Sequence, residues 1–594
     1  MKKTFLLSCL MLAAMPVMAA YTGHVYVDKN KNGVFDQSEK PLAGIKVSDG
    51  LNVVETAADG SFTLPGHERE RFIFITTPSG YKTFNRHYHK IEKKQSGYDF
   101  GLIPYSGRIR KDGSHRYIHI TDTEIFNTEN HADWVNNVHD YARNEQAAFI
   151  IHTGDICYEK GLKAHIKLMN TENMDCPVFY CIGNHDLVKG KYGEELFESI
   201  YGPVYYSFDA GNVHYVVTPM PGGDHAPGYT SDDVCRWLKN DLTHIRPGTP
   251  VVVFNHDLLT YEDTFIFKSK NAGSINLNEY NLKAWVYGHW HINYMKKQGD
   301  VYSVCTSSLD KGGIDHSTTA FRVMHVDSKG DFTSELRYTY LDKNICIASP
   351  AGVMASGVLP VAVNVYSSVS PVREVLYTCL ADGKPVLKNK RLLQSTDWSW
   401  NGELPLSHKY VGKELTLRVT ARFNNGEIAE AESNFICRTE KAVPLFSADW
   451  DNLSGNAKHS APVSAPLNLP LQLAWTNNVG ANLYMTSPLI HKGKVIVASV
   501  DEDLKGAGHV YALNGKDGTI LWSCPVRNSI KNSIAVDSDI VFAQDAQGFL
   551  YAIDTETGKL CWEKQLPVNG LPALIDGLVA GEGVVYAGTG KGLC

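Results

Sequence analysis

Five apolar segments in the middle of this chain each end in a cluster of side chains that can bind metal ions. The clusters are Asp122-Thr123-Glu124, Gly154-Asp155-Ile156-Cys157-Tyr158, Gly183-Asn184-His185-Asp186, Asn255-His256-Asp257 and Gly288-His289-Trp290-His291. Carboxylates and imidazoles are good ligands for Fe, Mn and Zn. Two such ions about 3.5–4 Å apart activate water as a nucleophile and neutralise charge on a phosphoryl group. The residue types therefore indicate a site for two metal ions that can activate water.

The spacing of the clusters predicts the elements that position them. Asp122, Asp155 and Asn184 follow one another at intervals of about 30 residues, and each interval suits one strand–helix–strand unit. In open α/β sheets, ligands bind beyond the carboxyl ends of the strands. A glycine before Asp155, Asn184 and His289 permits a sharp turn and close backbone approach. Residues 106–345 are therefore predicted to be an α/β domain whose clusters meet at one edge of one sheet.

The ordered clusters resemble the motifs of the calcineurin-like metallophosphoesterases, a superfamily that includes the purple acid phosphatases. That pattern is an early Asp, then GD, GNH[DE], a His and GHxH, and all five blocks occur in order within residues 122–291. The resemblance implies a β-sandwich flanked by helices. It also implies hydrolysis of phosphomonoesters or phosphodiesters by a hydroxide that bridges two transition-metal ions (Fe, Mn or Zn).

The resemblance implies a role for each matching residue. The first metal would be bound by Asp122 and His291, the second by Asn184, His256 and His289, and both by the bridging Asp155. His185 would contact the phosphate and protonate the leaving group. Asp186 would orient His185, as carboxylates around metal sites often do.

One position departs from the commonest form of the pattern. Many members have Asp-x-His in the first block, where the His helps to bind the first metal, and this chain has Glu124 there. Three alternatives stay open. Glu124 is itself the ligand, Tyr158 is the ligand as in the GDxxY block of purple acid phosphatases, or water fills the position.

Two further segments carry ligand-type side chains. The Gly-rich loop 311–316 is either a structural loop, which we favour, or brings Lys311 or His316 to the phosphate. In the N-terminal region a second set matches the calcium loop D-x-[DN]-x-[DN]-G-x5-E. Its residues are Asp28, Asn30, Asn32, Gly33, Asp36 and Glu39. The flanks are strand-like, so the alternatives are a Ca²⁺ site of an extracellular β module and a turn that needs no ion.

The regions on both sides of the α/β domain are predicted to be all-β. Residues 21–105 show alternating strand patterns and a hairpin signal at Asp59-Gly60, and residues 346–440 are typical of a β-sandwich. Residues 441–594 begin with a Ser-, Pro-, Ala- and Asn-rich linker that extends to residue 470.

The rest of the C-terminal region contains a repeat. Tyr511 and Tyr551 are 40 residues apart, and so are Trp522 and Trp562. This period is typical of propeller blades, and the motif resembles PQQ-like propeller repeats. Roughly two and a half blades are present where a propeller has 4–8. We therefore expect a truncated, poorly packed propeller, with completion by a second subunit as the alternative.

The N-terminus and the composition indicate an exported globular protein. Lys2 and Lys3 precede an apolar stretch from Phe5 to Ala14, and Val17-Met18-Ala19 is a small-residue cleavage site, so residues 1–20 are predicted to be a signal peptide. A lipoprotein anchored through Cys9 is the less favoured alternative. No later segment is long enough to cross a bilayer as a helix. Among 594 residues, 43% are hydrophobic and the net charge is −7, which does not indicate a nucleic-acid binder.

The cysteines after the signal peptide show no CxxC pattern. Export permits disulfides, and Cys176 with Cys181 is one candidate pair, but scattered buried thiols are the favoured interpretation.

Two functional hypotheses follow. The first is a periplasmic or extracellular metallophosphoesterase acting on a phosphorylated small molecule or protein, with β domains that bind a protein or glycan partner. The second is a catalytically inactive phosphatase-fold protein that binds through its propeller. The complete ligand set for the second metal and the presence of His185 argue against the hypothesis of an inactive binding protein. Specificity depends on loops and accessory domains, so the motifs leave the substrate open.

Overall fold

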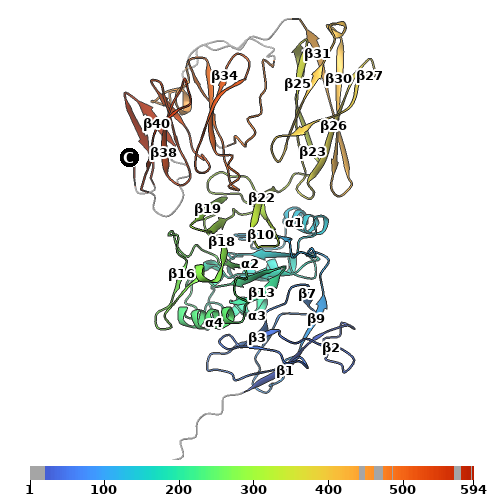
Figure 1. The fold of residues 1–594 in the computed structure, drawn as a ribbon, viewed down its shortest axis with the longest axis vertical. Coiled ribbons are helices and arrows are strands. Elements are labelled where there is room, and N and C mark those ends of the chain that lie inside the picture. The colour runs from blue at the N-terminus through green and yellow to red at the C-terminus, as the bar shows by residue number, and fades with distance from the viewer. Residues whose placement is uncertain (1–19, 440–448, 461–472, 485, 568–576, 590–591) are drawn as a thin grey trace, which may run out of the picture.

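The computed structural model describes residues 20–439, 449–460, 473–484, 486–567, 577–589 and 592–594. The molecule is elongated, with a small β domain at one end, an α/β domain in the middle and two β regions at the other end (Figure 1). Residues 1–19 of the predicted signal peptide lie outside the described residues, as does most of the predicted linker. None of the helices in the described part is long and apolar enough to cross a membrane.

The N-terminal region consists of two small sheets around one apolar core. Their strand orders are β2-β1-β9-β7, with β5 paired to β1, and β4-β3-β6-β8. The strands are β1 (Tyr21–Val27), β2 (Lys40–Pro41), β3 (Lys46–Ser48), β4 (Val53–Glu55), β5 (Ser61–Leu64), β6 (Phe72–Ile75), β7 (Tyr81–Thr83), β8 (Tyr88–Lys90) and β9 (Phe100–Pro104). The predicted Asp59-Gly60 hairpin is wrong, because β4 pairs with β3 and β5 pairs with β1. The turn itself forms, but pairing with β1 buries Phe62 and Leu64 in the core.

Two larger sheets form the central domain. Their strand orders are β12-β11-β10-β21-β22 and β13-β14-β15-β18-β20-β19. The strands are β10 (His115–Ile120), β11 (Phe149–His152), β12 (Val178–Tyr180), β13 (Tyr206–Ala210), β14 (Val213–Val217), β15 (Val251–Phe254), β18 (Leu282–Tyr287), β19 (Tyr294–Gln298), β20 (Val301–Cys305), β21 (Ala320–Val326) and β22 (Phe332–Tyr338), with a separate pair β16 (Ile266–Lys268) and β17 (Ser274–Asn276). The helices are α1 (Ala132–Asn144), α2 (Tyr158–Leu168), α3 (Glu195–Tyr201) and α4 (Ser231–Thr243), and the 3-10 turns are η1 (Asn184–Asp186) and η2 (Leu277–Tyr280).

The strands of the first central sheet are apolar on both faces. Tyr117 and Phe149 stack with ring centroids 4.7 Å apart in the core that includes side chains of both sheets. The alternate residue Ile118 joins a second core with Trp134 of α1 and Leu162 of α2. Because successive side chains of a strand point to opposite faces, this pattern places helices on one face and the second sheet on the other.

A buried, charged histidine joins the second sheet to α4. His214 Nδ1 lies 2.7 Å from Asp209 Oδ1, and its Nε2 lies 2.8 Å from Asp241 Oδ2. Burial alone would lower the pKa of His214, but the two carboxylates, Asp241 foremost, outweigh it and raise the pKa to about 9. The imidazolium is therefore part of the folded structure at neutral pH.

The next region, from β23 to β31, is a β-sandwich. The sheet orders are β23-β25-β29-β28 and β24-β31-β30-β26-β27. The strands are β23 (Asn344–Ser349), β24 (Gly352–Ala355), β25 (Val358–Tyr366), β26 (Val372–Ala381), β27 (Lys384–Arg391), β28 (Leu393–Gln394), β29 (Ser399–Pro405), β30 (Glu414–Phe423) and β31 (Ile428–Arg438), with the 3-10 turn η3 (His408–Tyr410). Alternating side chains of both sheets, such as Val363 and Leu417, form its core.

The C-terminal region, called here the propeller-like segment, contains two four-stranded sheets of identical order and a two-stranded sheet. The elements are η4 (Leu453–Gly455), β32 (Leu489–His491), β33 (Lys494–Ala498), β34 (His509–Asn514), β35 (Ile520–Pro525), β36 (Ala535–Asp537), β37 (Ile540–Gln544), β38 (Phe549–Asp554), β39 (Leu560–Gln565), β40 (Leu578–Gly581) and β41 (Val584–Ala587). Tyr511 and Tyr551 occupy the same register in the two sheets. Each lies one residue before the residue that pairs with a tryptophan of the next strand, Trp522 in the first sheet and Trp562 in the second.

Trp522 packs the first four-stranded sheet against the second, whereas Trp562 is exposed. Trp522 Nε1 donates to Thr555 O at 3.0 Å, and its ring lies where a Cβ on Gly558 would be, at 2.7 Å. Trp475, which comes before the first four-stranded sheet in the chain, packs in the same way on Gly518 in a turn of that sheet. The prediction of a poorly packed segment is wrong for the described residues, because both sheets share one buried core. That the propeller is truncated stays a prediction.

The described cysteines are all free, and both Cys176 and Cys181 are buried thiols. The candidate disulfide between them is therefore not formed, and the favoured interpretation of buried thiols holds for this pair.

Candidate metal centre

The five predicted clusters meet where the two central sheets adjoin. Asp122, Asp155 and Asn184 follow the parallel strands β10, β11 and β12, whereas His256 and His289 follow β15 and β18 of the second sheet. The prediction of one edge of one sheet is therefore wrong. After β12 the chain starts a second sheet, and face-to-face packing brings the two sets of strand ends together.

Several residues of the centre have a left-handed backbone. The φ angles are +49° at Asp122, +55° at Asp155, +66° at His289 and +50° at His291. Such conformations cost of order 1–3 kcal/mol each for residues other than glycine, and they cluster at functional sites. Here they turn the chain sharply after each strand, so that the side chain points back toward the other clusters.

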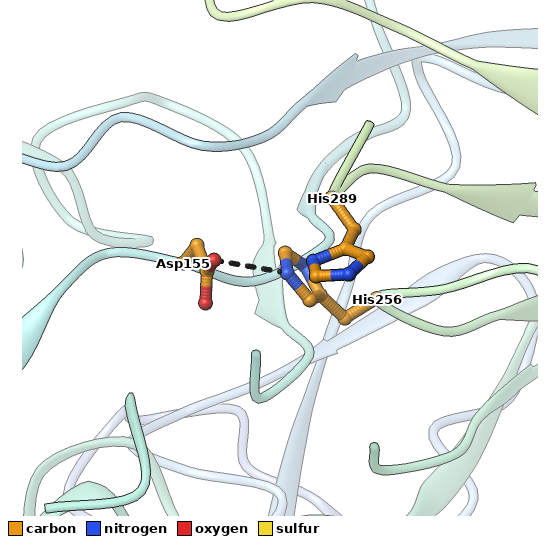
Figure 2. A group of neighbouring side chains, drawn as sticks. All are labelled: Asp155, His256 and His289. Carbon is orange, nitrogen blue, oxygen red and sulfur yellow. Dashed lines mark ion pairs between the residues drawn. The ribbon is translucent and has the colours of Figure 1, made fainter. Parts of the chain in front are cut away.

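Asp155, His256 and His289 form one close group. Each offers a ligand atom within 4.8 Å of the other two, and Figure 2 shows the Asp155 carboxylate directed at His256 with the His289 ring beside it. Asp155 Oδ2 lies 3.1 Å from His256 Nε2. His256 Nδ1 lies 2.8 Å from the carbonyl oxygen of Thr153, to which it donates its proton. The Nε2 lone pair is thereby directed into the centre.

Asp122 connects this group to His291. Asp122 Oδ1 lies 3.4 Å from His291 Nε2 and 3.9 Å from His256 Nε2. The other oxygen, Oδ2, accepts hydrogen bonds from the His289 backbone N–H at 3.0 Å and the Thr121 hydroxyl at 2.8 Å. These bonds hold Oδ1 toward the two histidines.

Three buried polar atoms of the centre have no hydrogen-bond partner among the described residues. They are Asp122 Oδ1, Asn184 Oδ1 and His256 Nε2. Unpaired buried polar groups are rare because each costs the desolvation of that group. A carboxylate oxygen, an amide oxygen and an imidazole nitrogen share one property, which is that all donate an electron pair to a cation. The centre therefore fits the two metal ions that the sequence predicts.

Electrostatics also favour a cation here. Burial raises the pKa of Asp122 to about 6, against the opposing effect of His256 and His291. For Asp155 the effect of burial is outweighed by His256, and its pKa falls to about 2. The ion pair with Asp155 in turn raises the pKa of His256 to about 10, although burial would lower it. A metal ion would take the place of the proton that His256 holds between the two carboxylates.

Two glycines permit the close packing of the centre. A Cβ on Gly183 would lie 2.2 Å from Asp155 Oδ1, and one on Gly288 would lie 1.9 Å from Thr121 Oγ1. Neither distance is sterically allowed, so both positions require glycine, as the sequence predicts.

His185 lies at the rim of the centre and is one-third exposed. Its Nδ1 donates to Asp224 Oδ2 at 2.9 Å, and its backbone N–H donates to Asp155 Oδ1 at 3.0 Å. Burial would lower the pKa of His185, but Asp224 and then Asp155 raise it. Nε2 is the nitrogen left for a ligand.

The predicted contact between Asp186 and His185 is wrong. Asp186 is fully buried, and its carboxylate accepts backbone N–H bonds from Asp155, Cys157 and Gly183, each 2.9 Å long. It fixes the loops instead of the imidazole, because these three donors use both of its oxygens. The sequence signal that we missed for Asp224 is Gly222-Gly223 before it, since a Cβ on Gly223 would lie 2.3 Å from Asn184 O.

The candidates for the first metal's missing ligand occupy different places. Glu124 Oε1 lies 3.7 Å from His291 Nε2, and Glu124 also groups with Asp155 and Cys157 within 4.8 Å. Tyr158 is 43% exposed, and its ring lies 5.4 Å from that of His185. Cys157 was not among the predicted ligands; burial, with Asp155 second, raises the pKa of its thiol. The geometry puts Glu124 nearer to His291 and Tyr158 nearer to His185.

The Gly-rich loop after β20 borders the centre. Lys311 Nζ lies 2.7 Å from Glu124 Oε2, and the Ile314 backbone N–H donates to His291 O at 2.9 Å. His316 is exposed and, within the described part of the chain, makes no hydrogen bond to the predicted ligands. Whether Lys311 or His316 contacts phosphate stays a prediction.

The predicted calcium loop folds as a tight turn after β1. Asp28 accepts backbone N–H bonds from Asn32 at 3.2 Å and Gly33 at 2.9 Å, and Asn30 Nδ2 donates to Asp36 at 2.7 Å. Glu39 accepts from the backbone of Lys29 at 2.9 Å. These bonds agree with either alternative, the Ca²⁺ loop or the turn, so the calcium site stays a prediction.

Three protein-family models match the chain. "Calcineurin-like phosphoesterase" matches residues 115–293, "N terminal of Calcineurin-like phosphoesterase" matches residues 29–104, and a PQQ-type model described as "Outer membrane protein assembly factor BamB" matches residues 472–594. The predicted architecture is confirmed: a metallophosphoesterase domain lies between all-β regions, with PQQ-like repeats at the C-terminal side.

Individual proteins give weaker similarity. Purple acid phosphatase 13 of Arabidopsis thaliana is 26% identical over 215 residues, which are 34% of this chain and 36% of that relative, so the chain spans about a third of its length. A solved predicted phosphoesterase from Streptococcus pneumoniae is 10% identical, over 38% of this chain and 98% of that chain, with a TM-score of 0.18. BamB from Moraxella catarrhalis is 12% identical, over 46% of this chain and 65% of that chain, with a TM-score of 0.16.

Scores this low add nothing to the fold assignment, which rests on the family models. Those models and the purple acid phosphatase similarity support metal-dependent phosphoester hydrolysis in general terms. Residues 115–293 match the calcineurin-like phosphoesterase family model, so the central domain of this chain is a metallophosphoesterase domain.

Proposed function

We propose that this chain hydrolyses phosphomonoesters or phosphodiesters at a two-metal centre held by Asp122, Asp155, Asn184, His256, His289 and His291. The observation that carries the proposal is the set of three buried ligand atoms that make no hydrogen bond, on Asp122, Asn184 and His256, with His256 Nε2 in ion-pair contact with Asp155 at 3.1 Å. They lie around Asp155, where one carboxylate can reach both ions. Buried polar atoms without a hydrogen bond are costly, and three electron-pair donors of this kind in one place favour a bound cation.

The chain's own residues account for the steps around the metals. Bound ions of this class supply Lewis acidity and a nucleophile at neutral pH. His256 and Asp122 are held in ligand geometry by Thr153, Thr121 and the His289 backbone. His185, whose ring is fixed by Asp224 and partly exposed, would bind a phosphate oxygen through Nε2 and pass a proton to the leaving group.

The test is metal-dependent release of p-nitrophenol from mono- and bis-p-nitrophenyl phosphate by the purified chain. We expect activity that chelation removes and that Fe, Mn or Zn restores. His185→Ala should retain its metals and lose on the order of 10²–10⁴ in rate. Absence of turnover on every phosphate ester by a protein that holds two ions would overturn the proposal.

That outcome would favour the second hypothesis, an inactive phosphatase-fold protein that binds through its propeller-like segment. Export to the periplasm or the cell exterior is part of our proposal, on the basis of the predicted signal peptide at residues 1–20. Fractionation of cells that express the full chain, with and without these residues, tests it. Recovery of the full chain in the cytoplasm alone would refute export.

A further inference from the structure

The propeller-like segment contacts the central domain through buried polar groups. Asn528 Nδ2 donates to the backbone oxygen of Met295 at 3.0 Å. Arg322 of β21 is fully buried and forms an ion pair with Asp503 at 2.6 Å. Lys531 is the group that reaches the surroundings of the metal centre. Its Nζ donates to Asn293 O at 2.6 Å, Asp315 Oδ2 at 2.7 Å and Glu502 Oε1 at 2.7 Å.

The Lys531 ion pairs are shielded from water. The side chains of Lys531, Asp315 and Glu502 are 1%, 0% and 4% exposed. Burial would lower the pKa of Lys531, but Glu502 and Asp315 outweigh it and raise the pKa, so the ammonium group stays charged. Its three hydrogen bonds use all the donors of an ammonium group. Removing this one cation would leave two carboxylates buried without a counter-charge, which is far less favourable than breaking a surface ion pair.

Two of the three acceptors of Lys531 belong to segments that adjoin His291 of the metal centre. Asn293 is two residues after His291, and its side-chain oxygen accepts the Ser307 N–H at 3.0 Å. Asp315 belongs to the Gly-rich loop, where its Oδ1 accepts from Ser317. The neighbouring Ile314 N–H donates to His291 O at 2.9 Å. Lys531 thus holds both the chain that follows His291 and the loop that bonds to the His291 backbone.

Within its own domain the loop is held by the Lys311–Glu124 ion pair and by backbone hydrogen bonds, but the buried carboxylate of Asp315 has no cationic partner there among the described residues. Its exposed members Lys311, Ile314 and His316 face away from the cores, and Gly312 has φ +77°. Its buried charged side chain, that of Asp315, finds its cationic partner in the propeller-like segment. His291 itself has a left-handed backbone (φ +50°), which surrounding contacts must maintain.

We infer that Lys531 of the propeller-like segment is a positioning residue for the metal centre, which holds His291 in ligand geometry through Asn293 and the Asp315 loop. This inference rests on the metal centre of the proposed function and extends it. The C-terminal region is then a working part of the phosphoesterase site and not only an appended binding module. Loss of this contact should weaken the ion bound by His291 and Asp122, and spare the ion bound by Asn184, His256 and His289.

The experiment uses the full chain with Lys531→Met, Asp315→Asn and Lys531→Arg. The matched control is Lys492→Met, which removes an exposed lysine of the same segment that pairs with exposed Asp539. Metal affinities are measured by titration against a chelator, and metal content by elemental analysis. In Lys531→Met and Asp315→Asn we expect one ion retained and the affinity for the other reduced about 10–100-fold. Lys492→Met should bind both ions as the parent does, and Lys531→Arg should restore much of the affinity.

Two further readouts separate positioning from general destabilisation. Co²⁺-substituted protein should show an altered visible spectrum in Lys531→Met, since coordination at one ion changes, and kcat should fall more than KM rises. Asp315→Asn keeps a similar shape and leaves Lys531 paired with Glu502, so it decides the matter if Lys531→Met does not fold. Parental affinity for both ions in a folded Lys531→Met or Asp315→Asn would overturn the inference. If the parent binds two ions but cleaves no ester, the proposed function fails and the affinity test of Lys531 still stands.

Discussion

The assignment of Asp224, and not Asp186, as the partner of His185 leads to the sharpest prediction about catalysis. Asp224→Asn keeps the shape of the side chain and removes the charge that faces His185 Nδ1 at 2.9 Å. The Asp224 side chain is 37% exposed, so the fold should lose no more than about 1 kcal/mol, the upper end for exposed ion pairs. The orientation of His185 is weakened, and changes of this kind reduce activity about 10–100-fold.

Asp186→Asn should behave in the opposite way. Its buried carboxylate accepts three backbone N–H groups. An amide places an NH₂ group against at least one of these donors. Hydrogen bonds to charged groups contribute about 1.5–3 kcal/mol, so we expect a loss of about 2–4 kcal/mol in unfolding free energy.

The assay is urea denaturation combined with kcat and KM for p-nitrophenyl phosphate on both metal-loaded variants. Asp224→Asn should lower kcat with little change in the denaturation midpoint. Asp186→Asn should lower the midpoint whatever its activity. Unchanged kcat in Asp224→Asn, together with a stable but slow Asp186→Asn, would refute the assignment.

Further predictions concern stability, metal binding and the open ligand positions. Because the folded pKa of His214 (about 9) exceeds its ordinary 6.5, its stabilisation should be complete below pH 6.5 and lost as pH rises through 9, a fall that urea midpoints should show in the parent and not in His214→Gln. Gly183→Ala should reduce turnover by about 10²-fold or more, since its Cβ displaces a ligand; parental turnover would contradict this. If Ca²⁺ binds the N-terminal loop, it should raise the melting temperature of the parent but not of Glu39→Gln, and identical melting would favour the turn. If Tyr158 binds Fe³⁺, Tyr158→Phe should bleach the oxidised protein and Glu124→Gln should not, whereas a colourless active iron enzyme would exclude Tyr158.

The sequence predicted which residues meet in the centre better than how the strands bring them together. Asp155, His256 and His289 are brought together because each follows an apolar strand, and glycine at 183 and 288 marks where backbone must approach closely. The division of the ligands between two sheets was not predictable from intervals along the chain, because a parallel strand has the same local pattern in either sheet.

The sequence patterns also did not predict contacts between segments that are far apart in the chain. Asp186 follows His185 directly, so adjacency favoured the wrong partner, whereas Asp224 reaches it only through a loop made close by Gly223. Lys531 belongs to no recognisable sequence motif, because its role depends on how the propeller-like segment lies against the central domain. Unpaired strand edges led us to expect poor packing of the propeller-like segment, but its packing depends on tertiary contacts that the sequence pattern does not show.

Metal stoichiometry of the purified chain tests the central claim most directly. We expect two transition-metal ions per chain in the parent after loading. We expect fewer than one in Asp155→Asn, because the proposed bridging carboxylate would contribute to both sites. A parent that binds a single ion, or an Asp155→Asn variant that retains two, would contradict the two-metal centre.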